Sequence, residues 1–157
     1  MFIDNIEINN FRNIIKAELS FDKNINFIIG NNAQGKTNII ESIFFSAFLK
    51  SFRTQKKTDL IKDGTDKLNI KSNIIKVGVN NFIDICIDKK NSYIKVNGKN
   101  PENFEFLNVV IFHPEEIDYI SNYPIFRRNL IDRSIFYINY NYINIYRNYL
   151  KCLKQRN

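Results

Sequence analysis

The stretch GNNAQGKT at residues 30–37 decides the fold of this 157-residue chain. It has the form G-x-x-x-x-G-K-[ST] of a phosphate-binding loop (P-loop), which joins a buried strand to a helix. The flanking residues fit that context, because a helix-like segment follows at 38–48. The apolar run that precedes the loop consists of Ile25, Phe27, Ile28 and Ile29. The sequence therefore predicts a buried strand, a glycine-rich loop and a helix in succession.

The residue types of the loop suit a nucleotide. Gly30 and Gly35 let the loop wrap tightly with its N–H groups toward phosphate oxygens, and the helix N-terminus adds the positive end of its dipole. Lys36 can reach the outer phosphates, and the Thr37 hydroxyl can ligate Mg²⁺. We predict that ATP and Mg²⁺ bind here. The predicted nucleotide-binding residues of the loop are Gly30, Asn31, Asn32, Ala33, Gln34, Gly35, Lys36, Thr37 and Asn38.

The composition is that of an ordered protein with a basic surface. Apolar residues make up 44% of the chain, with 14 Phe and 8 Tyr, which excludes a disordered tail. The net charge of +7 favours a polyanionic partner. Neither Cys86 nor Cys152 lies in a C-x-x-C pair, and no uncharged apolar run reaches membrane-spanning length. We therefore expect reduced thiols, no membrane partner and a cytoplasmic location.

Alternation of apolar and polar residues predicts five strands outside the P-loop unit. Two of them cover residues 2–8 and 15–21. The other three, at 68–77, 82–87 and 93–96, are separated by turn signals and predict an antiparallel meander.

The remaining elements are a further strand and three helices. The apolar run 107–112 predicts a buried strand that stops before Pro114. A short helix is expected near 59–61, and helical spacing of apolar side chains predicts helices over 125–135 and 142–153. The P-loop helix is apolar on most sides, so we expect it to lie buried between layers.

Several separated motifs are similar to those of one family. They are NFRN at 10–13, GNNAQGKTN at 30–38 with Glu41, KSFRT at 50–54, DLI at 59–61 with Gly64, FHPEE at 112–116, Pro124 with RR at 127–128 and LID at 130–132, and LKQRN at 153–157. The chain resembles the RecF family of bacterial recombinational repair proteins, relatives of the SMC-type ABC ATPases. The motifs stand in family order and span nearly the whole chain.

The resemblance implies an α/β fold. Residues 1–123 are expected to form lobe I of an ABC-ATPase head with an antiparallel β-meander, and residues 124–157 the helical start of lobe II, cut short. Family members are longer, and their later part holds the Walker B strand and the signature motif. Neither can be identified here, because 82–88 alternates into a hairpin and His113 follows 109–112 where an aspartate is needed. We therefore expect very slow ATP hydrolysis by this chain alone.

The function that the resemblance implies is ATP-dependent DNA binding in DNA repair, replication restart and the SOS response. In the family, ATP joins two heads into a homodimer that clamps single-stranded or junction DNA. With RecO and RecR, the dimer supports the loading of RecA. Two other hypotheses stay open, namely a different P-loop protein such as a small kinase or GTPase, and an inactive fragment.

Some residues outside the loop have a candidate role beside a structural one. By resemblance, Arg12 and Asn13 are expected near the nucleotide; the alternative for Arg12 is a solvated turn arginine. Arg53, in a basic loop, could link nucleotide state to DNA contact, or belong to a solvated charge run. Arg127 and Arg128 are candidates for DNA phosphate contacts. A local pair between Arg128 and the side chain four residues later, Asp132, is the structural alternative.

One cluster of polar residues is ambiguous. His113, Glu115 and Glu116 stand where SMC-type relatives sense Mg²⁺ and the attacking water. Acids in the first turn of a helix after Pro114 would also be explained by the helix dipole, and we prefer that interpretation. No metal site is expected at this single histidine.

Overall fold

The computed structural model describes residues 1–89, 91–101, 107–112, 122–139 and 141–156. By its contacts the chain divides into two compact units, Met1–Val110 and Ile111–Asn157. The boundary that we expected between residues 123 and 124 falls inside the second unit. The assignment of residues 1–123 and 124–157 to two lobes stays a prediction.

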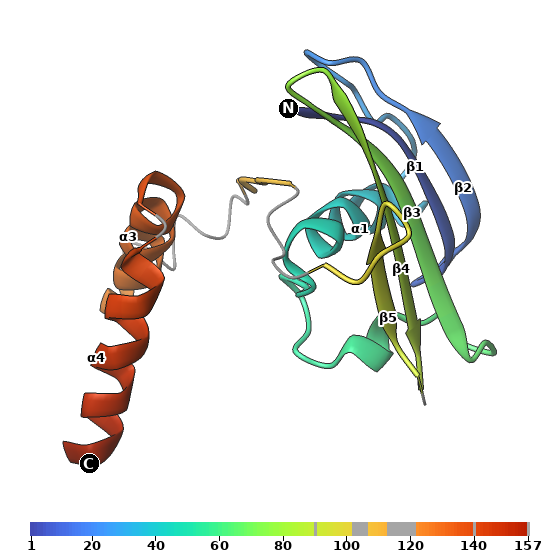
Figure 1. The fold of residues 1–157 in the computed structure, drawn as a ribbon. Helices are drawn as coiled ribbons and strands as arrows, with labels where there is room; N and C mark the ends of the chain where they lie inside the picture. Colours follow the sequence, from blue (N-terminus) through green and yellow to red (C-terminus); the bar gives the residue numbers. More distant parts are fainter. Residues whose placement is uncertain (90, 102–106, 113–121, 140, 157) are drawn as a thin grey trace. The chain divides into compact units, whose positions relative to one another are not determined.

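The first unit is built on one five-stranded antiparallel sheet with the order β2-β1-β3-β4-β5 (Figure 1). The strands are β1 (Phe2–Phe11), β2 (Ile14–Ser20), β3 (Lys67–Lys76), β4 (Val79–Asp88) and β5 (Tyr93–Val96). Every strand predicted from alternation is thus confirmed, the meander included. The period of two explains the match, because alternate side chains of a half-covered strand face the core.

The core lies on one face of this sheet. Ile8 in β1 pairs with Ile70 in β3, and Ile70 pairs with Ile85 in β4. All three are fully buried. This row of isoleucines, directly opposite one another across three strands, fixes the register, since a slip by one residue would turn the apolar set to the other face.

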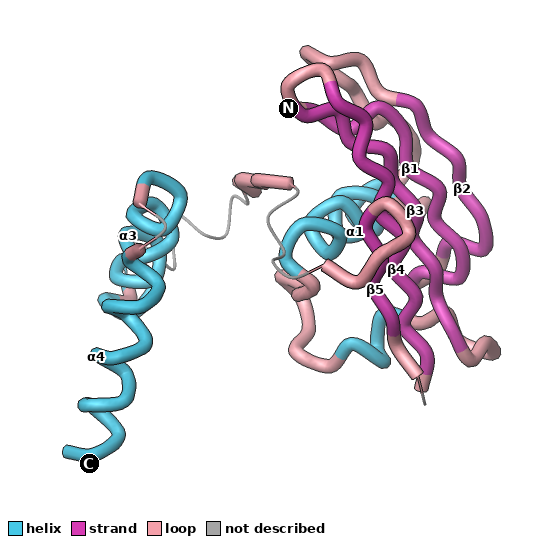
Figure 2. Tube along the Cα trace, viewed as in Figure 1, coloured by secondary structure: helices cyan, strands magenta, loops and turns pink. Residues whose placement is uncertain are grey.

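The helix α1 (Lys36–Phe48) packs against one face of the sheet (Figure 2). Phe45 on the helix meets Phe11 at the end of β1, with ring centroids 6.4 Å apart. The short 3₁₀ helix η1 (Lys57–Leu60) adds the buried Leu60 to the same core. Burial of α1 is one-sided, however, since Ile40 is 42% exposed. The expectation of a helix enclosed between layers holds for one face only.

The predicted strand before the P-loop is wrong for this chain. Residues 25–29 form no strand, and the side chains of Ile25, Phe27 and Ile29 are 71%, 83% and 91% exposed. The physical reason is the lack of a neighbour: no strand of the described chain hydrogen-bonds to this segment, so its backbone and apolar side chains have no partner.

The predicted strand at 107–112 is also wrong, because no described strand pairs with it. Leu107 is buried, but the segment has no strand pairing, and Val110 and Phe112 are 88% and 75% exposed. An apolar run shows that a segment could be covered on both faces. It does not show that the covering strands are present.

The described residues of the second unit form the helices α3 (Pro124–Ile138) and α4 (Tyr142–Arg156), as the helical spacing predicted. Pro124 occupies the first turn of α3, where its missing N–H costs nothing. The Tyr142 hydroxyl donates a hydrogen bond to Asp132 at 2.5 Å, and this bond joins the two helices and raises the pKa of Tyr142. In the part of the chain that the structure describes, no helix is long and apolar enough to cross a bilayer.

Candidate nucleotide-binding site

The P-loop backbone includes two residues with a positive φ, Ala33 at 64° and Gly35 at 94°. Gly35 stands immediately before α1 with a φ of 94°, in the left-handed region that favours glycine. A Cβ atom at this position would lie 3.0 Å from Oδ1 of Asn13. Two separate constraints, backbone angle and space, therefore disfavour a larger residue at Gly35.

The Lys36 side chain folds back over the loop. Its Nζ atom donates to the carbonyl oxygens of Gly30 and Asn31 at 2.7 and 2.8 Å. These bonds hold the two ends of the loop together and keep the cation beside it. The charge is thus already in place for an anion that enters the loop.

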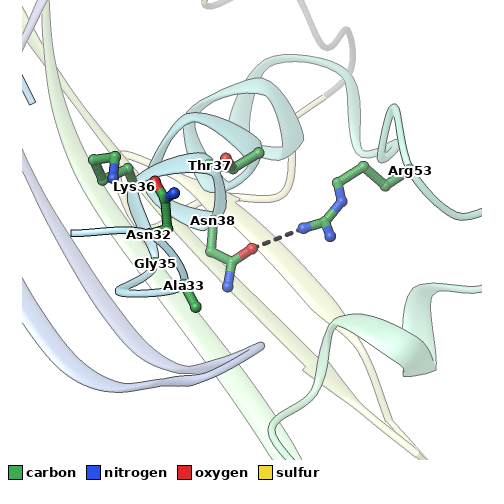
Figure 3. A pocket seen from close by; sticks show the side chains of 7 residues that line it. All are labelled: Asn32, Ala33, Gly35, Lys36, Thr37, Asn38 and Arg53. Atoms are coloured by element: carbon green, nitrogen blue, oxygen red, sulfur yellow. Dashed lines mark hydrogen bonds between the residues drawn. The ribbon is translucent and has the colours of Figure 1, made fainter. Parts of the chain in front are cut away.

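A hollow of about 260 Å³ opens next to the loop and the first turn of α1. Its lining residues are Asn32, Ala33, Gly35, Lys36, Thr37, Asn38 and Arg53. Figure 3 shows that Arg53 reaches toward Asn38 from the segment after the helix, while the others come from the loop and the helix start. The structure therefore brings Arg53 to the predicted phosphate site, a position that the sequence did not assign to it.

Two asparagines tie the P-loop to the turn between β1 and β2. Asn13 donates through Nδ2 to the carbonyl oxygen of Ala33 at 3.1 Å, and Asn38 donates through Nδ2 to Oδ1 of Asn13 at 2.7 Å. Both residues were predicted at the nucleotide site; Asn38 lines the hollow beside the loop, and Asn13 contacts the loop at Ala33. Their bonds position the loop; contact with a nucleotide stays a prediction.

Arg12 is not a solvated turn arginine. Its Nη2 and Nε atoms donate to the two carboxylate oxygens of Glu41 at 2.8 and 3.1 Å, and its Nη1 atom donates to the carbonyl oxygen of Asp59 at 3.0 Å. Glu41 is fully buried. A buried carboxylate needs such a partner, because an unpaired charge in the interior costs several kcal/mol.

A second hollow, of about 370 Å³, adjoins the first. It is lined by Arg12, Asn13, Asn38, Arg53, Asp59, Ile61, Lys62 and Asp63. Asn38 and Arg53 line both hollows. Sequence reasoning missed the residues at 59–63 and the role of Glu41. One signal was available for Glu41, namely a single acid in the middle of the apolar helix.

The other candidates lie elsewhere or outside the described residues. Arg127 and Arg128 are exposed on α3, in the second unit. No ion pair joins Arg128 to Asp132 in this part of the described chain. His113, Glu115 and Glu116 fall outside the described residues.

Acidic residues form no metal cluster in the described part of the chain. Asp84 lies in the antiparallel strand β4 and accepts a hydrogen bond from Asn69 at 2.7 Å, so it belongs to the sheet, as the alternation of this stretch indicated. Within the described ranges no group of three or more His, Cys, Asp or Glu side chains could hold a metal ion.

Comparison with known proteins places this chain in a family. Residues 2–116 match the family model described as RecF/RecN/SMC N terminal domain. The chain belongs to this family. It is 39% identical over its whole length to the DNA replication and repair protein RecF of Geotalea uraniireducens (strain Rf4), and 39% identical to the RecF of Clostridium acetobutylicum. The matched parts are 44% and 45% of those proteins, so the chain spans less than half the length of these curated relatives.

Solved structures agree with the RecF assignment. The structure of the recombination mediator protein RecF-ATP in the RecFOR pathway matches 99% of this chain and 43% of its own, with a TM-score of 0.84 and 32% identity. The SMC head domain from Thermotoga maritima matches 65% of this chain and 39% of its own, with a TM-score of 0.54 and 16% identity, and shows the fold alone. The resemblance to the N-terminal part of RecF and the ABC-ATPase lobe are both confirmed.

Proposed function

We propose that the chain binds ATP with Mg²⁺ at the P-loop and serves a RecF-like role in DNA repair. The observation that carries the proposal is the P-loop itself, in which Gly35 has a φ of 94° and Lys36 is held over the loop carbonyls. A relative of 32% identity was solved with ATP, which supports the choice of nucleotide.

Each part of the site is assigned a different contact with the nucleotide. The amides of the loop and of the first turn of α1 bind phosphate oxygens, and Lys36 supplies the cation. The Thr37 hydroxyl, which lines the first hollow, would hold Mg²⁺, and the ion would neutralise part of the phosphate charge. The second hollow, with its donors and acceptors at Arg12, Asn13 and Lys62, offers adjoining space for the nucleoside.

The test is a titration with fluorescent ATP. Lys36→Ala removes a charge-assisted contact worth about 1.5–3 kcal/mol, so affinity is expected to fall about 10- to 100-fold. Lys76→Ala, at the exposed end of β3 in the first unit, is the matched control and leaves affinity unchanged. Equal affinity of the Lys36→Ala chain and the parent would contradict the assignment.

The DNA part of the proposal rests on the basic character of the chain and on its relatives. We propose that single-stranded or junction DNA is the polyanion and that Arg127 and Arg128 on α3 contact its phosphates. A DNA contact of Arg53, which belongs to the other unit, is a separate part of the proposal. As part of a longer RecF-like protein the chain would also share in an ATP-dependent homodimer and act with RecO and RecR in support of RecA loading. Slow hydrolysis by this chain alone is part of the same proposal.

Salt dependence tests the DNA part. Each phosphate neutralised contributes about 0.9 to the slope of log affinity against log salt on duplex DNA, and about 0.7 on single strands. Replacing Arg127 and Arg128 with glutamine is expected to lower the slope by up to about 1.4 on single-stranded DNA. An unchanged slope would assign both arginines a structural role only. Lys151→Gln on α4 is the control for loss of one charge elsewhere in this unit.

A further inference from the structure

The buried carboxylate of Glu41 lies on α1, one turn beyond Lys36 and Thr37. It is the meeting point of side chains from separate segments. Arg12 donates two hydrogen bonds to it, Ser51 donates one through Oγ, and Nη1 of Arg53 lies 3.4 Å from Oε2. The proposed binding of ATP assigns no role to this group.

Ser51 extends the influence of Glu41 to the backbone of the following loop. While its hydroxyl donates to Glu41, the same oxygen accepts the backbone N–H groups of Arg53 at 2.9 Å and Thr54 at 3.1 Å. Thr54 in turn donates through Oγ1 to the carboxylate of Asp59 at 2.7 Å. The carboxylate therefore fixes the turn from which the Arg53 side chain departs.

The two arginines are held unequally. Arg12 makes a two-pronged contact with Glu41 at 2.8 and 3.1 Å, and its side chain is 21% exposed. Arg53 has one short bond, 2.8 Å to Oδ1 of Asn38, and a long one to Glu41, and its side chain is 48% exposed. Arg53 also lines the hollow beside the P-loop. Arg12 therefore compensates the buried charge, and Arg53 stays accessible to an anion in that hollow.

We propose that Glu41 is a positioning residue of the nucleotide site. Through Ser51 and Arg53 it holds the loop at residues 50–57 so that the Arg53 guanidinium faces the phosphate hollow before the nucleotide arrives. A side chain held in place loses less conformational freedom on binding, and this preorganisation raises affinity. The inference rests on the proposed function, because the anion is the phosphate of ATP.

A double-mutant cycle on the 157-residue chain tests the coupling. Glu41→Gln and Arg53→Gln are each expected to weaken binding of fluorescent ATP about tenfold, the effect of losing one charge-assisted contact. The double variant is expected to bind no more weakly than either single one, since Glu41 acts through Arg53. Additive losses, or a Glu41→Gln chain that binds like the parent, would overturn the proposal.

Ser51→Ala is the control for unfolding caused by Glu41→Gln, because it leaves the pair of Arg12 and Glu41 in place. It is expected to reproduce part of the loss in affinity in the parent and none of it in the Arg53→Gln background. A parent chain that fails to bind ATP, or binds it regardless of Lys36→Ala, refutes the nucleotide site itself. Binding that needs Lys36 but ignores Glu41 and Ser51 refutes this inference alone.

Limited trypsin digestion gives a readout that needs no nucleotide. Glu41→Gln and Ser51→Ala are expected to speed cleavage within the loop, after Arg53, Lys56 and Lys57. Cleavage after Lys76, the last residue of β3 before the turn to β4, is the internal control and is expected to stay unchanged. An equal rise at both places would mean that Glu41 supports the fold as a whole, and would overturn its role as a positioning residue.

Discussion

Gly35→Ala should separate the two constraints on the P-loop, and Gly78→Ala is its matched control. Gly35 and Gly78 have φ values of 94° and 75°, so both substitutions place a Cβ atom in the left-handed region, at a cost of about 1–2 kcal/mol each. A Cβ atom at Gly78, in the turn between β3 and β4, meets nothing within 4 Å. The same atom at Gly35 lies 3.0 Å from Oδ1 of Asn13.

The extra cost at Gly35 follows from what that oxygen does. Oδ1 of Asn13 accepts the hydrogen bond of Asn38, so moving it away forfeits a bond worth about 0.5–1.5 kcal/mol. The expected loss in free energy of unfolding is about 1.5–3.5 kcal/mol for Gly35→Ala and about 1–2 kcal/mol for Gly78→Ala. Because the loop must shift, Gly35→Ala is also expected to lower ATP affinity at least about tenfold, while Gly78→Ala leaves it unchanged.

Urea denaturation measures the first effect and a titration with fluorescent ATP the second. The reasoning would be refuted by a Gly35→Ala chain as stable as the Gly78→Ala chain that also binds ATP like the parent. Equal stability loss with impaired ATP binding would retain the nucleotide site and refute the contact with Asn13.

Three further predictions concern burial. Arg12→Ala leaves the carboxylate of Glu41 buried without its main partner, so it should lower the free energy of unfolding, measured in urea, by about 3–5 kcal/mol. The loss should be smaller when Arg12→Ala is combined with Glu41→Gln. A loss as small as that of a surface substitution would contradict the pairing. Phe45→Ala, in the core, should lower the free energy of unfolding by about 3–5 kcal/mol. Phe27→Ser should change it by less than about 0.5 kcal/mol, because Phe27 is 83% exposed. Comparable losses for the two variants would mean that residues 25–29 are covered. Burial raises the pKa of the Cys86 thiol. In a chain whose other cysteine is replaced by serine, the alkylation rate of Cys86 should therefore become half-maximal at a higher pH in the folded protein than in urea. Coincident pH profiles would contradict this.

Local patterns predicted the sheet well because apolar and polar residues alternate within each of its strands. In β3 every second side chain from Leu68 to Ile74 is buried, so the alternation in the sequence is the alternation in the structure. The turn signals at 89–91 and 97–98 also separated β4 from β5 and ended β5 correctly. The helix α1 followed from the P-loop, whose sequence requires a helix directly after the glycines.

The two strand predictions that were wrong, at 25–29 and 107–112, failed for a reason that cannot be recognised from the local sequence. Ile25 and Phe112 stand in apolar runs that predict covered strands, yet each is exposed, because strand formation depends on a neighbour from another part of a polypeptide. The network around Glu41 was missed for a related reason. Its partners come from residues 10 to 29 positions away, and only the fold brings Arg12, Ser51 and Arg53 to one carboxylate.

Hydrogen exchange followed by mass spectrometry tests the central claim most directly, because it shows where the nucleotide acts. With saturating Mg-ATP, the account predicts slower exchange of the backbone amides in residues 30–38, whose N–H groups bind the phosphates. Lys36→Ala at the same ATP concentration should remove this protection. Protection confined to other segments, or protection of residues 30–38 that persists in the Lys36→Ala chain, would contradict the account.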